Sequence, residues 1–387
     1  MSAPWLTEAD ADLAEFVRIV STPSNPADYP HAAGVEQGIV VFDGASLPGA
    51  ELVEERRAVM AEISHALLEG PGVVAFRGSF RDGDVIDRAS AVFDEIIAEQ
   101  HASGTASGDH FAKPGANDRI WNALEKFALR DPQGFADYYS NDVIALASRS
   151  WLGPNYQVTS QVNVVNPGGQ AQVPHSDYHL GFMGREQNEA YPAHVHRLSQ
   201  ALTIQGAVAH CDMPLETGPT FYLPHSQKFP SVYLAWRRTD VAGYVEEHKV
   251  QLALAKGDAV FFNPALLHGA GTNVTTDVRR MANLLQVSSA FGRAMETVDR
   301  MSMANALFPV LSEGYRTGSM APDALDNVIA ASAEGYAFPT NLDRDQPING
   351  LAPPSQAELV RTAVREGWDA QALERALAAH AMRRMTT

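Results

Sequence analysis

A histidine and an aspartate two positions apart, in a chain with another histidine far downstream, constrain this fold more than any other feature. His175 and Asp177 follow a turn at 166–169. On an extended segment, residues i and i+2 point to the same side, so the two side chains can reach one metal ion together. His268 lies in a separate stretch of the chain. A shared site therefore requires a fold that brings two distant extended segments together.

Two histidines and one carboxylate with open positions opposite them form the ligand set of non-haem Fe(II) oxygenases. The same three ligands also suit Zn²⁺, and a His-x-Asp pattern can arise by chance in a chain with 13 histidines. The residues by themselves leave three hypotheses open. These are an Fe(II) oxygenase, a zinc-dependent metallohydrolase, and a ligand-binding β-sandwich that is not an enzyme.

The pattern of β-strands begins after Trp151. A run rich in β-branched and aromatic residues at 156–165 ends at a turn. Further short strands are predicted at 200–210, 218–224, 249–263 and 279–290. Short strands separated by turn residues, without alternating helices, predict an all-β sandwich or barrel. We expect a jelly roll, because this form can place ligands from separate strands at one open mouth.

Helical patterns flank this predicted core at both ends of the chain. Residues 1–150 read as mostly helical, apart from a short buried strand at 73–76, and residues 293–387 read as a helical extension. No linker or repeat divides the sequence. We therefore expect one domain over 1–387, mainly β, with a jelly-roll core at 151–292 that holds the metal site and helices packed around it.

Composition excludes some partners. The formal net charge of −17 argues against broad nucleic-acid binding, which needs a basic surface. No long apolar run or leader pattern is present, so we expect no membrane contact and a cytoplasmic location. Cys211 is the single cysteine, which excludes an intrachain disulfide. A small-molecule substrate is the expected partner, and the sequence does not reveal the oligomeric state.

Two adjacent arginines, Arg279 and Arg280, open the last predicted strand. Neighbouring residues on a strand face opposite ways, so one guanidinium can enter the core while the other meets solvent. A buried guanidinium is costly unless an anion pairs with it. Alternation by itself does not decide which of the two points inward.

Four segments carry a resemblance to a known family: 173–179 (VPHSDYH), 216–228 (ETGPTFYLPHSQK), 257–262 (GDAVFF) and 268–273 (HGAGTN). Together with Arg279, eleven residues after His268, they resemble the phytanoyl-CoA dioxygenase family of Fe(II)/2-oxoglutarate oxygenases. The combination is far more specific than any one motif.

The resemblance implies a double-stranded β-helix in which His175, Asp177 and His268 bind Fe(II). It also implies 2-oxoglutarate and O2 as co-substrates, with Arg279 binding the 5-carboxylate of 2-oxoglutarate and Arg280 as the alternative. The implied reaction is hydroxylation, or another oxidation, of an unactivated C–H bond in a small metabolite, with release of succinate and CO2. Asp177 favours hydroxylation, because halogenating relatives lack a carboxylate there.

Other side chains are candidates for contacts with the co-substrate or the substrate. Asn163 and Thr220, on predicted strands, could contact 2-oxoglutarate, although structural hydrogen bonding would also explain Asn163. The candidates for substrate contact are Lys113, Tyr178, His179 and Phe182. A CoA thioester would need a basic entrance, for which the sequence offers only the scattered Arg197, Lys228, Arg237 and Arg238. The sequence does not name the substrate.

Overall fold

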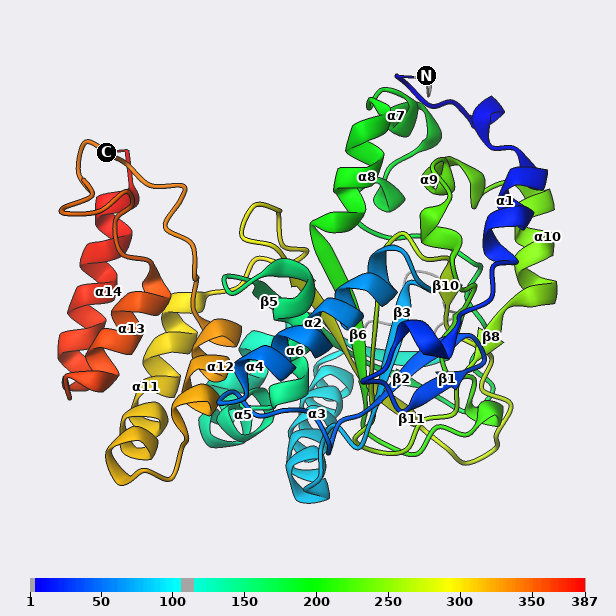
Figure 1. The fold of residues 1–387 in the computed structure, drawn as a ribbon. Helices are drawn as coiled ribbons and strands as arrows, with labels where there is room; N and C mark the ends of the chain where they lie inside the picture. Colours follow the sequence, from blue (N-terminus) through cyan, green and yellow to red (C-terminus); the bar gives the residue numbers. More distant parts are fainter. Residues whose placement is uncertain (1–3, 106–114, 387) are drawn as a thin grey trace.

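The structure, a computed structural model, describes residues 4–105 and 115–386, and this part of the chain contains two β-sheets (Figure 1). The larger sheet has eight strands in the order β1-β2-β3-β9-β6-β11-β5-β4, and the smaller has three in the order β10-β7-β8. The larger sheet consists of β1 (Gly34–Glu36), β2 (Ile39–Asp43), β3 (Val73–Arg77), β4 (Asn117–Ile120), β5 (Gln157–Val165), β6 (Thr203–Ala209), β9 (Ala259–Phe262) and β11 (Arg280–Ser288). The smaller sheet consists of β7 (Phe221–Tyr222), β8 (Val250–Gln251) and β10 (His268–Gly269).

Strand β11 is an interior strand of the larger sheet, and its side chains point alternately to the two faces of the sheet. It pairs antiparallel with β5 and with β6, so that Ala282 lies opposite both Asn163 and Ala209. Because side chains on a strand alternate between the two faces, β11 contributes to two different environments. Met281, Leu285 and Val287 join the main hydrophobic core, whereas Arg280, Ala282, Leu284 and Gln286 line a cavity.

Helices from both ends of the chain cover one face of the larger sheet. Phe76, Val162 and Leu285 from the strands pack there with Phe127 and Leu307 from the helices, and removing these apolar surfaces from water stabilises the layer. The helices that contribute to this core are α2 (Val53–Leu68), α3 (Gly83–Ser103), α4 (Ala123–Arg130), α5 (Pro132–Tyr139), α6 (Asp142–Leu152), α11 (Arg300–Thr317), α12 (Pro322–Ser332), α13 (Gln356–Arg365) and α14 (Ala370–Arg384).

The other face of the larger sheet packs against the smaller sheet. Val41, Val260 and Phe262 from the larger sheet form a hydrophobic cluster with Tyr222 of β7 and Leu266. Five shorter helices lie at the same end of the molecule as the N-terminus (Figure 1). They are α1 (Leu13–Val20), α7 (Arg185–Glu189), α8 (Ala193–Ala201), α9 (Val232–Ala235) and α10 (Thr239–His248).

The observed class is mixed α/β, with 45% helix, rather than the mainly β fold expected from the sequence. The strand predicted at 73–76 is β3, but the prediction for the first 150 residues missed β1, β2 and β4. β1 and β4 are edge strands of three and four residues, too short to carry a clear alternation. β2 and β3 pair in parallel with α2 between them, so the N-terminal part extends the same sheet as the predicted core.

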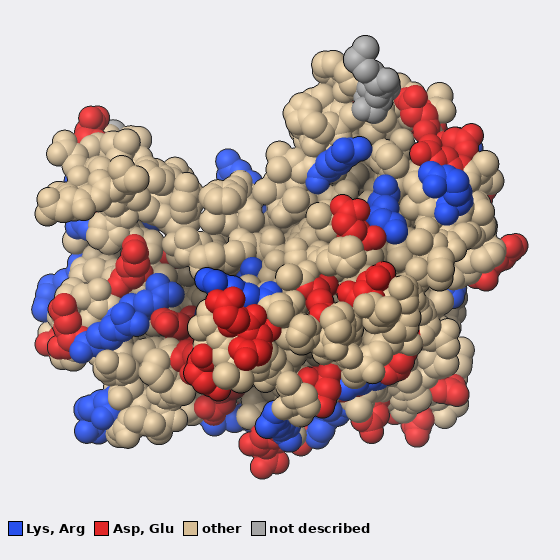
Figure 2. Space-filling view, in the orientation of Figure 1, with Lys and Arg blue, Asp and Glu red and all other residues tan. Residues whose placement is uncertain are grey.

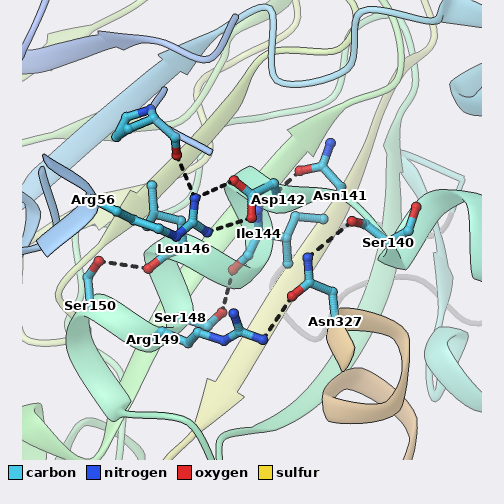
Figure 3. A network of polar contacts seen from close by, with 11 residues as sticks. Arg56, Ser140, Asn141, Asp142, Ile144, Leu146, Ser148, Arg149, Ser150 and Asn327 are labelled. Atoms are coloured by element: carbon cyan, nitrogen blue, oxygen red, sulfur yellow. Dashed lines mark hydrogen bonds and ion pairs between the residues drawn. The ribbon is translucent and has the colours of Figure 1, made fainter. Parts of the chain in front are cut away.

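The C-terminal part of the described chain consists of helices α11–α14 and the loops that join them. Helices α11–α14 form one edge of the molecule in Figure 1, beside α4 and α5. A polar network ties this extension to α6 (Figure 3). In it, Arg149 Nη2 donates to Asn327 Oδ1 at 2.9 Å, and the Asn327 amide donates to the Ser140 carbonyl at 3.2 Å.

The same network contains a bidentate ion pair between α2 and α6 (Figure 3). Arg56 Nη1 and Nη2 donate to the two carboxylate oxygens of Asp142 at 2.7 and 2.5 Å, and Nη1 also reaches the Pro48 carbonyl at 2.9 Å. Only 9% of the Arg56 side chain is exposed. Bidentate geometry and partial burial make this pair stronger than an ordinary surface ion pair.

Acidic and basic side chains are mixed over the face of the molecule shown in Figure 2, and the surface is hollowed into a saddle between the C-terminal helices and the N-terminal end. Among the helices of the described residues, none combines the length and the apolar character needed to span a bilayer.

Candidate metal centre and its cavity

The backbone brings the two predicted histidines side by side. His175 and His268 form an antiparallel bridge in which each backbone N–H donates to the other residue's carbonyl, at 3.0 and 3.1 Å. The same two segments are joined again by Asp177 N to the Pro264 carbonyl, at 2.8 Å, and by Ser176 Oγ to the Ala265 carbonyl, at 2.8 Å. Two distant stretches of sequence are thereby held in register at one point.

The three predicted ligands converge. His175, Asp177 and His268 each offer a ligand atom, and these atoms lie within 4.8 Å of one another. Nε2 of His268 is 3.4 Å from Oδ2 of Asp177, and Nε2 of His175 is 3.9 Å from Oδ1. One ion could therefore bind all three atoms at once.

Both imidazoles are oriented by their own backbone. Nδ1 of His175 lies 2.8 Å from the Val173 carbonyl, and Nδ1 of His268 lies 2.8 Å from the Leu266 carbonyl. A carbonyl only accepts, so each Nδ1 carries the proton and each Nε2 keeps its lone pair. This arrangement fixes the tautomer that metal-binding histidines need.

The carboxylate of Asp177 is held ionised. Burial by itself would raise its pKa, but when the imidazoles are protonated the hydrogen bond from His268, the positive charges of both rings and the Gln205 amide together lower the pKa to about 2. Gln205 Nε2 donates to Oδ2 of Asp177 at 2.7 Å, which also fixes the rotation of the carboxylate. Two neutral imidazoles and one carboxylate fit a divalent iron ion well.

The ligands open onto a cavity of about 800 Å³ between the two sheets, within the size range of small-molecule sites. His175, Asp177 and His268 all line it. Its floor is the inward face of the larger sheet, and small side chains cover much of it. The residues of the two central strands that line the cavity are Arg280, Ala282, Leu284 and Gln286 of β11 and Gln205, Gly206, Ala207 and Ala209 of β6.

The two adjacent arginines diverge. Arg280 is 5% exposed, lines the cavity and donates from Nη1 to the Thr217 carbonyl at 3.1 Å. Arg279 precedes the strand, is absent from the residues that line this cavity, and reaches Asp94 of α3 at 3.3 Å on the exposed surface. Of the two arginines, Arg280, the alternative candidate, is therefore the one that lines the cavity with the predicted metal ligands.

Most of the other predicted residues reach the cavity. Asn163, Thr220, Tyr178, His179 and Phe182 all line it. Asn163 also accepts a hydrogen bond from Asn117 at 3.3 Å, which gives it the structural role considered from the sequence. Lys113 lies outside the described residues. Of the four basic residues considered for an entrance, Arg237 lines the cavity, whereas Arg197, Lys228 and Arg238 are not among its lining residues.

Sequence reasoning missed the two glutamines on the cavity floor. Gln205 and Gln286 are cross-strand partners on β6 and β11, and both line the cavity. A side-chain oxygen of each is buried without a hydrogen-bond partner in the described part of the chain. A lone glutamine in an otherwise apolar strand was the available signal, because buried polar groups require partners.

The three converging side chains match the facial set of two histidines and one carboxylate that non-haem iron oxygenases use. The phytanoyl-CoA dioxygenase family matches residues 36–281, more than half of the chain, so the chain belongs to this family. It is a 2-oxoglutarate-dependent oxygenase, with Fe and 2-oxoglutarate as its cofactor and co-substrate.

Solved structures with a similar fold are distant in sequence. The non-heme alpha ketoglutarate dependent epimerase SnoN from nogalamycin biosynthesis is 17% identical, with a TM-score of 0.44 over 60% of this chain and 82% of that chain. The carbocyclase SnoK from the same biosynthesis is 18% identical, with a TM-score of 0.43 over 64% and 87%. A further SnoN structure, described as a complex with Fe3+, alpha ketoglutarate and nogalamycin RO, is 18% identical, with a TM-score of 0.43 over 60% and 85%. A search among curated proteins finds no match.

Proposed function

We propose that this enzyme hydroxylates an unactivated C–H bond of a small organic metabolite and releases succinate and CO2 from 2-oxoglutarate. Family membership and the donor set support the class of reaction. The observation that carries the co-substrate assignment is the position of Arg280, whose guanidinium lines the same cavity as His175, Asp177 and His268.

Arg280 is a buried cation for which the described residues supply no anionic partner. Burial lowers its pKa to about 10, and no carboxylate of the described residues forms an ion pair with it, because its bond to the Thr217 carbonyl is with a neutral group. A buried guanidinium without an anion is unfavourable. The 5-carboxylate of 2-oxoglutarate would fill this need through two parallel hydrogen bonds, so we assign Arg280, rather than Arg279, as the anchor.

The cavity floor beside Arg280 leaves room for a short dicarboxylate. Ala282 is the next inward residue on β11, and Ala209 lies opposite it on β6. Methyl side chains at both positions keep the space above the sheet open. Thr220 and Tyr222 line the cavity as well, and we propose that the Thr220 hydroxyl contributes a hydrogen bond to the bound carboxylate.

The protein's own contribution is to hold the ligands and exclude water. Bound iron supplies the redox chemistry with O2. His175 and His268 present Nε2 toward the metal position, and Asp177 supplies the negative charge. We propose that Tyr178, His179 and Phe182 border the substrate, and that the two facing sheets are the halves of a double-stranded β-helix.

A zinc-dependent hydrolase would use the same three ligands but would leave Arg280 without an anionic partner. The two functions are separated by anaerobic addition of Fe(II) and then 2-oxoglutarate, followed by visible absorption. We expect the charge-transfer band of an iron-bound 2-oxo acid, and succinate formation after O2 is admitted. The absence of the band at saturating Fe(II), together with no succinate, would contradict the proposal. This test needs no knowledge of the substrate.

A further inference from the structure

We propose that the substrate is an amphipathic anion, with a carboxylate or phosphate group that Arg237 and Arg293 bind and an apolar body that rests against Phe182 and Met295. This inference rests on the proposed function and names the class of substrate. It follows from the charge of the cavity, from the surroundings of the two arginines, and from the apolar residues that line the same cavity.

The cavity has the opposite charge balance to the rest of the protein. The whole chain has 46 acidic and 29 basic residues. Among the described residues that line the cavity, one is acidic, Asp177, and four are arginines. The lining arginines are Arg119, Arg237, Arg280 and Arg293. Iron binding uses Asp177, and 2-oxoglutarate uses Arg280, so cationic groups remain after both have bound.

The guanidinium of Arg237 contacts neutral groups, and none of these contacts neutralises its charge. Its Nη2 donates to the Met183 carbonyl at 2.8 Å, and its guanidinium stacks on the Trp236 ring at 3.9 Å. Among the described residues no carboxylate pairs with it, and burial by itself lowers its pKa. Five N–H donors are available on a guanidinium, so some remain for a ligand.

Arg293 and Arg237 both contact the segment 179–183. His179 Nε2 is 3.3 Å from the Arg293 carbonyl, while the carbonyls of Gly181 and Met183 accept from Arg237. Within the described residues, the Arg293 side chain makes no hydrogen bond or ion pair. The segment 179–183 begins two residues after Asp177, so Arg237, through its guanidinium, and Arg293, through its backbone, both contact the chain that follows the metal ligand, and both line the cavity.

The lining of the same cavity also includes exposed apolar side chains. Phe182 is 56% exposed, Val173 is 65% exposed and Met295 is 38% exposed, and all three line the cavity. Large apolar groups that surround an opening favour an apolar ligand surface. An uncharged ligand would remove water from the nearby guanidinium groups without supplying an ionic partner in its place. An anion with an apolar body would pair with the guanidinium groups and also cover the exposed apolar side chains.

A pair of dyes tests the charge requirement. 1-Anilinonaphthalene-8-sulfonate and neutral N-phenyl-1-naphthylamine share the same rings and differ in one anionic group. We expect Arg237→Gln and Arg293→Gln each to weaken binding of the anionic dye about tenfold and to change binding of the neutral dye less than about twofold. Arg238→Gln is the matched control, because Arg238 pairs with Asp240 at 2.6 Å and does not line the cavity.

Displacement by ten-carbon compounds then identifies the kind of anion. Decanoate, decyl phosphate and decanol are compared as competitors of the anionic dye. Stronger displacement by either anion than by decanol supports the proposal, and the better anion distinguishes a carboxylate from a phosphate substrate. Equal displacement by decanol would overturn it, as would equal effects of Arg237→Gln and Arg238→Gln.

The design separates failure of this inference from failure of the proposed function. Dye binding is measured with and without Fe(II) and 2-oxoglutarate, so it reports on the arginines even if 2-oxoglutarate does not bind. Arg237 also supports the 179–183 backbone, and for that reason Arg237→Lys is included to retain the charge. Arg293→Gln removes a side chain that makes no bond within the described residues and should not disturb folding. An unchanged Kd in Arg293→Gln and full loss in Arg237→Lys would indicate a structural role and contradict the proposal.

Discussion

Arg279 and Arg280 are neighbours in the sequence, yet their guanidinium groups lie on opposite sides of the larger sheet. Arg280 is buried in the cavity, while Arg279 meets Asp94 at the surface. The separation follows from strand alternation, and it gives a matched pair of positions one residue apart for testing the co-substrate site.

Replacing Arg280 by glutamine should remove the anion partner of 2-oxoglutarate. We expect Arg280→Gln to raise the Kd for 2-oxoglutarate by about 10- to 100-fold, the value of one or two charge-assisted hydrogen bonds. Arg279→Gln should change it less than twofold, because its exposed ion pair contributes little. The Kd is measured by anaerobic titration of the Fe(II) enzyme. A larger effect of Arg279→Gln would reverse the assignment.

The metal site should depend on His175. Its imidazole provides one of three ligand atoms, so His175→Ala should abolish stoichiometric Fe(II) binding while the far-ultraviolet circular dichroism stays unchanged. His194→Ala is the control, since His194 lies on α8 outside the cavity lining. Metal content after purification without chelator measures the effect. Retention of a full equivalent of iron by His175→Ala would refute the site.

Gln205 should tune the metal site without binding the metal. Loss of its hydrogen bond to Asp177 in Gln205→Leu should weaken Fe(II) or Mn(II) binding by about 10- to 100-fold, as for other groups that orient a metal ligand. Gln286→Leu provides the comparison, because Gln286 lies opposite Gln205 and no bond joins it to Asp177 in the described structure. Mn(II) electron paramagnetic resonance gives the affinity without turnover. Equal affinities in both variants would exclude this role.

The ion pair between α2 and α6 should contribute measurably to stability. Arg56→Met leaves Asp142 without its bidentate partner, and with Asp142 40% exposed we expect the free energy of unfolding to fall by about 1–3 kcal/mol. Arg57→Met breaks only the exposed pair with Glu54 and should cost less than about 0.5 kcal/mol. Urea denaturation followed by circular dichroism compares the two. Equal midpoints would show that the pair contributes nothing.

Sequence reasoning was most successful where the chemistry is local. His175 and Asp177 share a face because they are two residues apart on an extended segment, and the three predicted ligands do converge. The helical C-terminal extension and the strand at 73–76 were predicted from periodicity over contiguous residues. Each of these features is encoded within a short window, where backbone geometry directly decides which way side chains point.

The strands missed in the first 150 residues show the limit of such patterns. β1 and β4 hold three and four residues, and their pairing partners are far away in the sequence. Short strands gain stability only from the sheet that receives them, so their own residues carry little signal. The mixed α/β class therefore emerged only with the assembled sheet.

By itself, the sequence was enough to predict the three residues that converge and, through the resemblance of four segments, the family, because ligand type and spacing are properties of the chain. Only the tertiary structure decided that Arg280 faces the cavity and Arg279 does not. Strand alternation puts neighbouring side chains on opposite faces, but because both faces of β11 are buried, the sequence does not show which arginine takes which face. It also placed Gln205 against Asp177 and gathered four arginines around one cavity in an acidic protein. Those relationships join residues from separate strands and loops, and the packing of the sheets creates them.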